Sequence, residues 1–245
     1  MKHAFLIQAH EDPEQLYNLI QALNAKDSLF YVHIDKKASD FTNSIFYQQL
    51  LTYCNVHFTE RIKVYWGGFS QVKATLILLN EAIKESDVYY FHFLSGHDYP
   101  IKGIDYILTF FENNNKNYLN YIPEESKLKH FIDRYYFYDN DYINPRNKNN
   151  SIKRKVIRSS IIFIQRITWF FVQVLKFPIR KRIDMKYYHG SCWFSFTKKA
   201  VNYILTYIQR NPWILKRFNY TACPDESFFT MLLMNNDKFR NRIFI

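Results

Sequence analysis

The N-terminal part of the chain has a strand–helix–strand pattern with polar residues directly after each strand, and this pattern restricts the fold more than any other feature. His3–Gln8 and Leu29–Ile34 are short apolar runs typical of buried strands, and Pro13 opens a segment between them with apolar residues at helical spacing. Such a unit is typical of a parallel α/β sheet, whose ligands bind beyond the carboxyl ends of the strands. His10 and Asp35 follow the two strands, so we expect both at such a site.

A second stretch, Val64–Lys102, combines a glycine turn, a helical pattern and a strand that ends in polar residues. The chain has only five glycines, so the adjacent pair in Trp66-Gly67-Gly68 indicates a backbone that another group approaches closely. The tryptophan is then either a wall of a binding site or a core residue. The predicted strand Val88–Leu94 leads into the cluster Ser95–Asp98, which either contacts a ligand or satisfies the backbone of its own turn.

The length of 245 residues and the hydrophobic fraction of 48% predict one α/β domain with a substantial core. The formal net charge of +11 favours an anionic partner: nucleic acid, an anionic membrane, or a small substrate such as a nucleotide diphosphate. Nucleic acid ranks last because no signature of a nucleic-acid-binding module is present. Three cysteines without paired ligand spacing argue against structural zinc and fit a reducing cytosol. Lys2–Gln8 reads as a strand rather than as a signal segment.

Residues 151–182 form a basic insertion that interrupts the α/β pattern. Within it, Ile157–Phe177 is rich in isoleucine, phenylalanine, tryptophan and valine, and its polar residues fall on one helical stripe. Arg166 interrupts the apolar run, and an arginine at the centre of a spanning helix costs about 2.5–3.5 kcal/mol. We therefore predict an amphipathic helix that lies on an anionic membrane surface; the alternative is that its apolar face packs on the domain.

The segment Pro224-Asp225-Glu226 is the candidate for catalytic chemistry. The proline fixes a sharp helix start, so a carboxylate there is held rigidly and stays ionised near the positive end of the helix. An ionised carboxylate is what a general base needs, and we assign that role to Glu226 and the helix cap to Asp225. The alternative is that both carboxylates only cap the helix.

Several short motifs occur in an order that one enzyme family shares. They are Ala9-His10, Tyr31–Lys37, Trp66-Gly67-Gly68, Ser95–Pro100, Gly190-Ser191-Cys192-Trp193-Phe194 and Pro224-Asp225-Glu226-Ser227-Phe228-Phe229. In this order the chain resembles the core-2/I-branching N-acetylglucosaminyltransferase and peptide O-xylosyltransferase family, over nearly its whole length outside residues 140–182. The resemblance implies one α/β, GT-A-like nucleotide-sugar-binding domain over residues 1–245, with a mixed, mainly parallel central sheet flanked by helices.

The resemblance also implies roles by position, with Glu226 as the catalytic base. The donor, a UDP-sugar, would contact Ala9, His10, Asp35, Trp66, Gly67, Ser95 and Asp98, with the uracil beside the first two. The acceptor would contact the region of Glu124, Lys127 and Trp193. Without the resemblance, Asp35 is often just a turn former, and the charges around Glu124 are a cluster on a helix surface.

Asp139-Asn140-Asp141 matches the Asp-x-Asp pattern with which many nucleotide-sugar transferases hold a divalent ion. It lies in a loop without a clear preceding strand, and the family that the chain resembles works without metal, so we expect no metal and no cofactor. The family's diphosphate-binding arginine and lysine follow the Pro-Asp-Glu helix, and we expect that this chain lacks that C-terminal end. Either other basic residues substitute or the protein is inactive; the candidates are Lys36, Lys63, Lys102, Lys238, Arg240 and Arg242.

These expectations combine into one predicted function. It is an inverting glycosyltransferase that moves N-acetylglucosamine or xylose from a UDP-sugar to a hydroxyl of a glycan or lipid-linked oligosaccharide. The alternatives are a catalytically inactive nucleotide- or glycan-binding module and a membrane-surface scaffold built on Ile157–Phe177. Composition and the missing signal segment favour the cytoplasm of a bacterium, with the protein peripheral on the inner face of its membrane.

Overall fold

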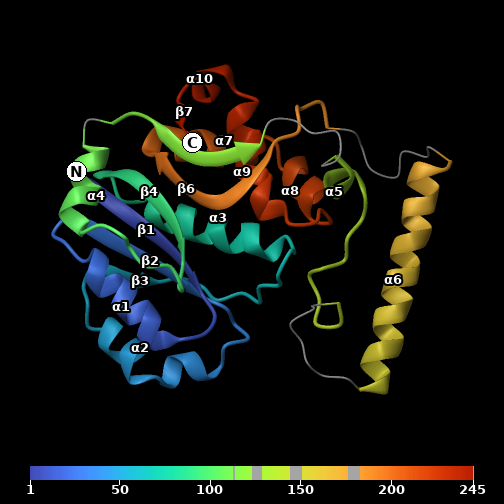
Figure 1. The fold of residues 1–245 in the computed structure, drawn as a ribbon, viewed down its shortest axis with the longest axis horizontal. Helices are drawn as coiled ribbons and strands as arrows, with labels where there is room; N and C mark the ends of the chain where they lie inside the picture. Colours follow the sequence, from blue (N-terminus) through green and yellow to red (C-terminus); the bar gives the residue numbers. More distant parts are fainter. Residues whose placement is uncertain (113, 123–128, 144–150, 176–182, 245) are drawn as a thin grey trace.

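A mixed sheet of seven strands forms the centre of the structure (Figure 1). The computed structural model describes residues 1–112, 114–122, 129–143, 151–175 and 183–244. The strands are β1 (Lys2–Ala9), β2 (Ser28–Ile34), β3 (Val56–Phe58), β4 (Val88–Ser95), β5 (Asn117–Ile122), β6 (His189–Thr197) and β7 (Ile243–Phe244). Their order in the sheet is β3-β2-β1-β4-β6-β5-β7.

β1 lies in the middle of the parallel part of the sheet. It pairs in parallel with β2 and β4, and β3 extends this part beside β2. β6 is antiparallel to both of its neighbours, β4 and β5. Ala9 at the end of β1 lies opposite Ile34, and Gln8 lies opposite both His33 and Ser95. The chain therefore leaves β1, β2 and β4 at one edge of the sheet.

Helices cover both faces of this sheet, and side chains of β1 alternate between two cores. Phe5 and Ile7 belong to the core beneath α1 and α2, whereas Ala4 and Leu6 belong to the core that α3, α7 and α9 close. The helices and 3-10 turns are α1 (Pro13–Leu23), η1 (Asp40–Asn43), α2 (Ile45–Leu50), α3 (Ser70–Ala82), α4 (Ile104–Phe111), α5 (Lys129–Asp133), α6 (Ile152–Gln173), α7 (Lys198–Arg210), α8 (Trp213–Phe218), η3 (Pro224–Glu226), α9 (Phe228–Met234) and α10 (Asp237–Arg240). The predicted α/β fold with a mixed, mainly parallel sheet flanked by helices is confirmed.

The helix α6 stands at the side of the molecule, away from the sheet (Figure 1). Within the described residues it begins and ends earlier than the predicted Ile157–Phe177. Its contact with the loop after α5 runs through Trp169, whose indole Nε1 donates to the carbonyl of Tyr135 at 3.1 Å. The same ring packs against Tyr136 and lies below the guanidinium of Arg134.

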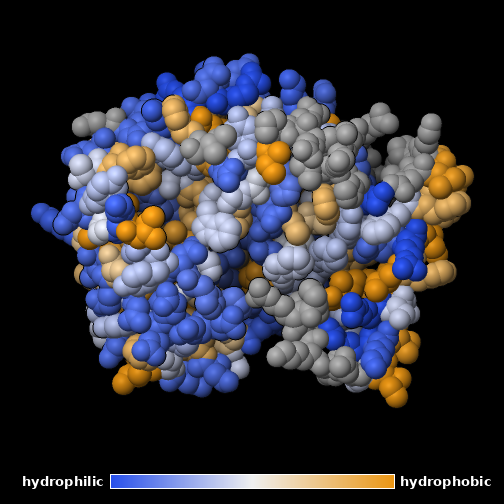
Figure 2. Space-filling model, viewed as in Figure 1, coloured by the Kyte–Doolittle hydropathy of each residue, from blue (hydrophilic) through white to orange (hydrophobic). Residues whose placement is uncertain are grey.

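Most large apolar side chains of α6 are exposed, and Figure 2 shows orange side chains along this edge of the molecule. Among them are Ile152, Val156, Phe163, Ile164, Ile167, Phe170 and Phe171. The polar residues Arg154 and Gln165 are buried instead. The alternative of an apolar face packed on the domain is therefore wrong for these side chains. No helix in the described part of the chain is long and apolar enough to cross a membrane.

Candidate active site

A cleft of about 650 Å³ opens at the edge of the sheet where β1, β2 and β4 end. Its walls come from these strand ends, from the Trp66 turn, from β6 and from the turn η3. Of the residues predicted for the site, seven line it: Ala9, His10, Asp35, Trp66, Ser95, Trp193 and Glu226. The proposed base and most of the proposed donor contacts thus share one cavity.

Asp35 is buried at the end of β2, where it fixes its own loop and also lines the cleft. Its Oδ1 accepts from the backbone N–H of Lys37 at 2.9 Å and of Val64 at 3.3 Å. The ammonium of Lys37 lies 3.4 Å from Oδ2. Arg61 supports the same loop by donating to the backbone carbonyl of Asp35 at 2.9 Å. Asp35 is thus a turn former whose carboxyl group also borders the cleft.

The Trp66-Gly67-Gly68 turn supplies another wall. Trp66 is 52% exposed and lines the cleft, so the alternative that it is a core residue is wrong. Gly67 has a φ of +71°, which L-residues rarely adopt, and a Cβ on Gly68 would lie 2.1 Å from an oxygen of Asp139. Gly67 does not line the cleft itself. Its carbonyl accepts from the N–H of Cys223 at 3.0 Å, which joins this wall to the turn that carries the proposed base.

Glu226 lies beside His189 of β6, a residue that sequence reasoning did not assign to the site. The imidazole Nε2 lies 3.3 Å from Glu226 Oε2, and Nδ1 lies 3.4 Å from the backbone oxygen of Glu226. Burial lowers the pKa of His189 and so favours a neutral ring with one N–H, which can donate to only one of these two acceptors at a time.

Burial raises the pKa of the Glu226 carboxyl. This shift is opposite in direction to the one that the end of a helix would give. The reason is local: Pro224–Glu226 is a single 3-10 turn separated from α9, so desolvation outweighs any effect of a helix dipole.

Asp225 does not cap a helix, contrary to the sequence prediction, because neither η3 nor α9 has a side-chain cap hydrogen bond. Its Oδ2 instead accepts from Gln71 Nε2 at 3.1 Å, and Gln71 Oε1 accepts from the N–H of Gly67 at 2.6 Å. Burial, helped by the neighbouring Glu226, raises the pKa of Asp225 to about 7. Gln71 thereby connects the glycine turn to the carboxyl next to the proposed base.

The Ser95–Asp98 turn follows β4 at the rim of the cleft. Asp98 Oδ2 accepts from the N–H of Ser95 at 2.8 Å and from the indole Nε1 of Trp193 at 2.7 Å. Asp98 lines a second cavity of about 410 Å³ rather than the main cleft. This second cavity has mainly apolar walls and shares Phe93 and Trp193 with the cleft, so the two cavities adjoin.

The two carboxylates of the Asp-x-Asp pattern serve different partners. Asp139 accepts from the backbone N–H of Ser70 at 3.2 Å and from its hydroxyl at 2.6 Å, at the N-terminus of α3. Asp141 lines the cleft and lies 3.8 Å from the ammonium of Lys63. Because the α3 terminus uses Asp139, the pair does not offer two carboxylates to one ion.

Lys37 is the one lysine or arginine lining the cleft within the described ranges. Its ammonium lies beside Asp35 and 4.3 Å above the ring of Tyr65. The six basic residues named from the sequence as diphosphate partners are all described, and none of them lines the cleft. Glu124 and Lys127, which were assigned to the acceptor, lie outside the described residues.

Further residues that line the cleft were not predicted from the sequence. Gln71 carried a weak signal, because it is a polar residue in the first turn of the helix that follows the glycine pair. Nothing in the sequence distinguishes His33 from a core residue. Burial lowers the pKa of His33 to about 4. Cys192 also lines the cleft, and burial raises the pKa of its thiol to about 12.

A mixed sheet with a cleft at the carboxyl ends of its parallel strands is the arrangement in which open α/β sheets bind their ligands. The sequence profile of the Core-2/I-Branching enzyme family matches residues 3–244, and the chain belongs to this family.

Known proteins similar to this chain include two animal xylosyltransferases. Xylosyltransferase 1 of Rattus norvegicus is 25% identical over 240 residues, which cover 95% of this chain and 26% of that protein. Xylosyltransferase 2 of Homo sapiens is 25% identical over 230 residues, which cover 91% of this chain and 23% of that protein. The chain thus spans about a quarter of the length of these relatives. Core-mannan synthase A from Aspergillus fumigatus, solved in a Mn/GDP form, matches with a TM-score of 0.40 and 10% identity over 98% of this chain and 71% of that one.

Proposed function

We propose that this chain is an inverting glycosyltransferase that moves N-acetylglucosamine or xylose from a UDP-sugar to a hydroxyl group of a glycan. The observation that carries the proposal is the presence of Glu226 in the same cleft as Ala9, Asp35 and Trp66. The names of the two animal relatives, both xylosyltransferases, support a sugar donor of this class.

In the proposed reaction the acceptor hydroxyl attacks the anomeric carbon from the face opposite UDP. The bond from the acceptor oxygen to that carbon forms while the bond from the carbon to the diphosphate oxygen breaks. Glu226 takes the hydroxyl proton, and UDP leaves with the bonding electron pair. A base acts best when its pKa lies near the working pH, and burial moves the pKa of Glu226 in that direction. His189, at 3.3 Å from Oε2, would orient the carboxylate.

The donor would occupy the strand-end side of the cleft. The uracil would lie against Ala9 and His10, Asp35 would accept from the uridine, and the Trp66-Gly67 turn would form the wall. Ser95, at the end of β4, would be near the transferred sugar. The support for this arrangement is that these residues line one cavity, apart from Gly67, which fixes the wall from behind.

Catalysis without a metal is part of the proposal. Its support is the engagement of Asp139 with the N-terminus of α3, which leaves the Asp-x-Asp pattern without a paired ligand set. Lys37, which lines the cleft, would interact with the negative charge that develops on the leaving diphosphate.

The acceptor would approach through the second cavity, where Trp193 and Asp98 lie. The apolar walls of that cavity support an acceptor with an apolar part, such as a lipid-linked oligosaccharide, over a free glycan. The net charge of +11 and the exposed apolar face of α6 support attachment to an anionic membrane surface, which we take to be the inner face of a bacterial membrane.

The base assignment is tested by Glu226→Gln with UDP release from a panel of UDP-sugars as the readout. Because a positioned base contributes about 10²–10⁴-fold, we expect transfer to fall by that factor while UDP affinity stays the same. Glu81→Gln, an exposed carboxylate of α3 that pairs with Lys84, is the matched control. Transfer that survives in Glu226→Gln would remove the base assignment.

The same panel separates the two alternatives. If the chain binds UDP but releases no UDP from any UDP-sugar, neither with EDTA nor, separately, with added divalent ions, it is a nucleotide-binding module without catalysis. The exposed apolar side chains of α6 favour the membrane-surface scaffold as a second candidate function. That function predicts binding to anionic vesicles that Phe163→Ser with Phe170→Ser abolishes, and no affinity for UDP.

A further inference from the structure

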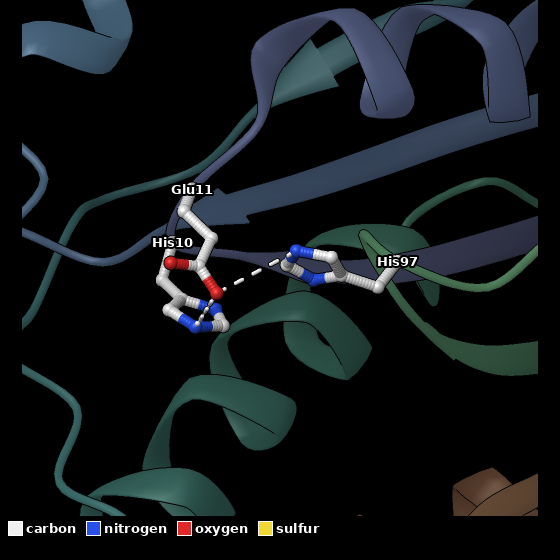
Figure 3. A group of neighbouring side chains, drawn as sticks. All are labelled: His10, Glu11 and His97. Carbon is white, nitrogen blue, oxygen red and sulfur yellow. Dashed lines mark ion pairs between the residues drawn. The ribbon is translucent and has the colours of Figure 1, made fainter. Parts of the chain in front are cut away.

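Three side chains form a compact group of two imidazoles and one carboxylate, and two of them, His10 and Glu11, line the cleft (Figure 3). His10 and Glu11 lie in the loop after β1, and His97 lies in the Ser95–Asp98 turn after β4. Figure 3 shows the Glu11 carboxylate between the two rings. One ligand atom of each side chain lies within 4.8 Å of the other two.

From this geometry we infer that His10, Glu11 and His97 bind a divalent transition-metal ion of the Zn²⁺ class. Glu11 Oε1 lies 3.1 Å from His10 Nε2 and 3.6 Å from His97 Nε2. Tetrahedral zinc with bonds of about 2.0–2.2 Å separates its ligand atoms by about 3.4 Å, and the two distances lie on either side of that value. The distance of 3.1 Å also fits a hydrogen bond from His10, whereas 3.6 Å is too long for one, so direct bonding joins Glu11 to only one of the two rings.

The ligand types and their exposure fit the same ion. Two imidazoles with one carboxylate leave a fourth position for water, which is the ligand set of many protein zinc sites. All three side chains are accessible to solvent, so an ion can enter, and a small rotation of an exposed ring closes the longest separation. Hard cations such as Mg²⁺ prefer oxygen ligands alone, which argues for a transition metal.

The fold holds these groups together through backbone contacts that involve none of the three side chains. The N–H of Gly96 donates to the carbonyl of Gln8 at 2.8 Å, which ties the turn after β4 to the end of β1. A Cβ on Gly96 would lie 2.9 Å from the Cβ of Ala9, so the close approach needs glycine here. Asp98 closes the turn from its other end by accepting from the N–H of Ser95.

Occupation of this site would compete with the nucleotide. His10 and Glu11 line the same cleft as Glu226, and the proposed function, on which this step rests, puts His10 beside the uracil. An ion that takes His10 Nε2 withdraws the ring from that contact and fills the rim. Zinc would therefore act as an inhibitor of donor binding rather than as a cofactor of transfer.

Metal binding itself is tested without any activity measurement, by Co²⁺ titration of the untagged chain followed by visible absorption and displacement with Zn²⁺. Cys54 is exposed and can bind metal, so Cys54→Ser serves as the background. We expect one equivalent of Co²⁺ with the intense bands of a tetrahedral site. Since loss of an outer partner already costs 10–100-fold in affinity, Glu11→Gln and His97→Gln should each cost at least about 100-fold.

His57→Gln, an exposed histidine on β3, is the matched control and should bind Co²⁺ as the background does. Absent bands, or bands that persist in His97→Gln, would overturn the site. UDP affinity is then measured in each variant with and without Zn²⁺. Zinc should weaken UDP binding in the background and have no effect in His97→Gln. Bound metal that leaves UDP affinity unchanged, or increases it, would overturn the inhibitory role. If Glu226→Gln still transferred sugar, the base assignment would fail, but the Co²⁺ result would not change.

Discussion

Replacing Asp225 by asparagine should stabilise the protein at neutral pH and leave its stability unchanged in acid. The carboxyl of Asp225 is buried next to Glu226, and burial raises its pKa from 3.8 to about 7. Asparagine keeps an oxygen that can accept from Gln71 Nε2, and it carries no charge at any pH. It therefore imitates the protonated form of Asp225.

The size and the sign of the effect follow from linkage. Between pH 3.8 and about 7 the folded chain holds a proton on Asp225 that the unfolded chain has released, so stability falls as the pH rises. Each pKa unit corresponds to about 1.4 kcal/mol, so the full shift is worth roughly 4 kcal/mol. The advantage of Asp225→Asn should therefore be below about 1 kcal/mol at pH 4 and approach the full value above pH 7.

Urea unfolding followed by circular dichroism at pH 4 to 8 measures this difference. With a urea dependence of about 2–3 kcal/mol per molar, 4 kcal/mol moves the midpoint by about 1–2 M. Asp184→Asn, an exposed carboxylate, is the matched control and should show no pH-dependent advantage. An advantage of Asp225→Asn that is the same at pH 4 and pH 8 would refute the assignment of a carboxyl held protonated by burial.

The remaining predictions concern the neighbours of Asp225. The apparent pKa of the acid limb of the kcat/KM profile should lie above about 4.3, the value typical of an exposed glutamate, because burial raises the pKa of Glu226. An apparent pKa at or below about 4.3 would exclude Glu226 as the base. Gln71→Ala removes the partner of both Gly67 and Asp225 and should lower stability by about 1–3 kcal/mol in urea unfolding, whereas Gln49→Ala, on the exposed side of α2, should cost less than about 0.5 kcal/mol. Asp139→Ala removes the acceptor at the N-terminus of α3 and should cost about 1–2 kcal/mol without making transfer depend on added metal; a new metal dependence would contradict the capping role.

The fold was predictable from the sequence because its strands and helices follow from patterns of neighbouring residues. The continuous apolar run of β1 and the helical spacing of α1 can be read from consecutive residues, and both elements occur where the pattern predicts them. The placement of His10 and Asp35 at one edge also follows from chain direction alone, since parallel strands end together. For α6 the sequence left two placements open, because amphipathic spacing shows that a helix has two faces but not which face meets the domain.

The contacts inside the cleft were not predictable in the same way. His189 and Gln71 reach the Pro-Asp-Glu turn from 37 and 154 residues away, and no local pattern reports such a pairing. Asp139 matched a metal-binding pattern only through its neighbours in the sequence, whereas its partner Ser70 is 69 residues away. Long-range hydrogen bonds thus decided which carboxylates are used for structure and which face the cleft.

The pKa shifts of the two carboxyls of the Pro-Asp-Glu turn bear on the alternatives that the sequence left open. A carboxylate that caps a helix accepts from backbone N–H groups in its charged form, and such bonds lower its pKa. Here the pKa of Asp225 and the pKa of Glu226 both move upward, because burial dominates. A domain has a net stability of only about 5–15 kcal/mol, so a carboxyl that costs roughly 4 kcal/mol at neutral pH is a large expense for a residue with only a structural role. Groups whose pKa values are raised in this manner are characteristic of functional sites, and we therefore expect selection for the chemistry of this turn rather than for its stability.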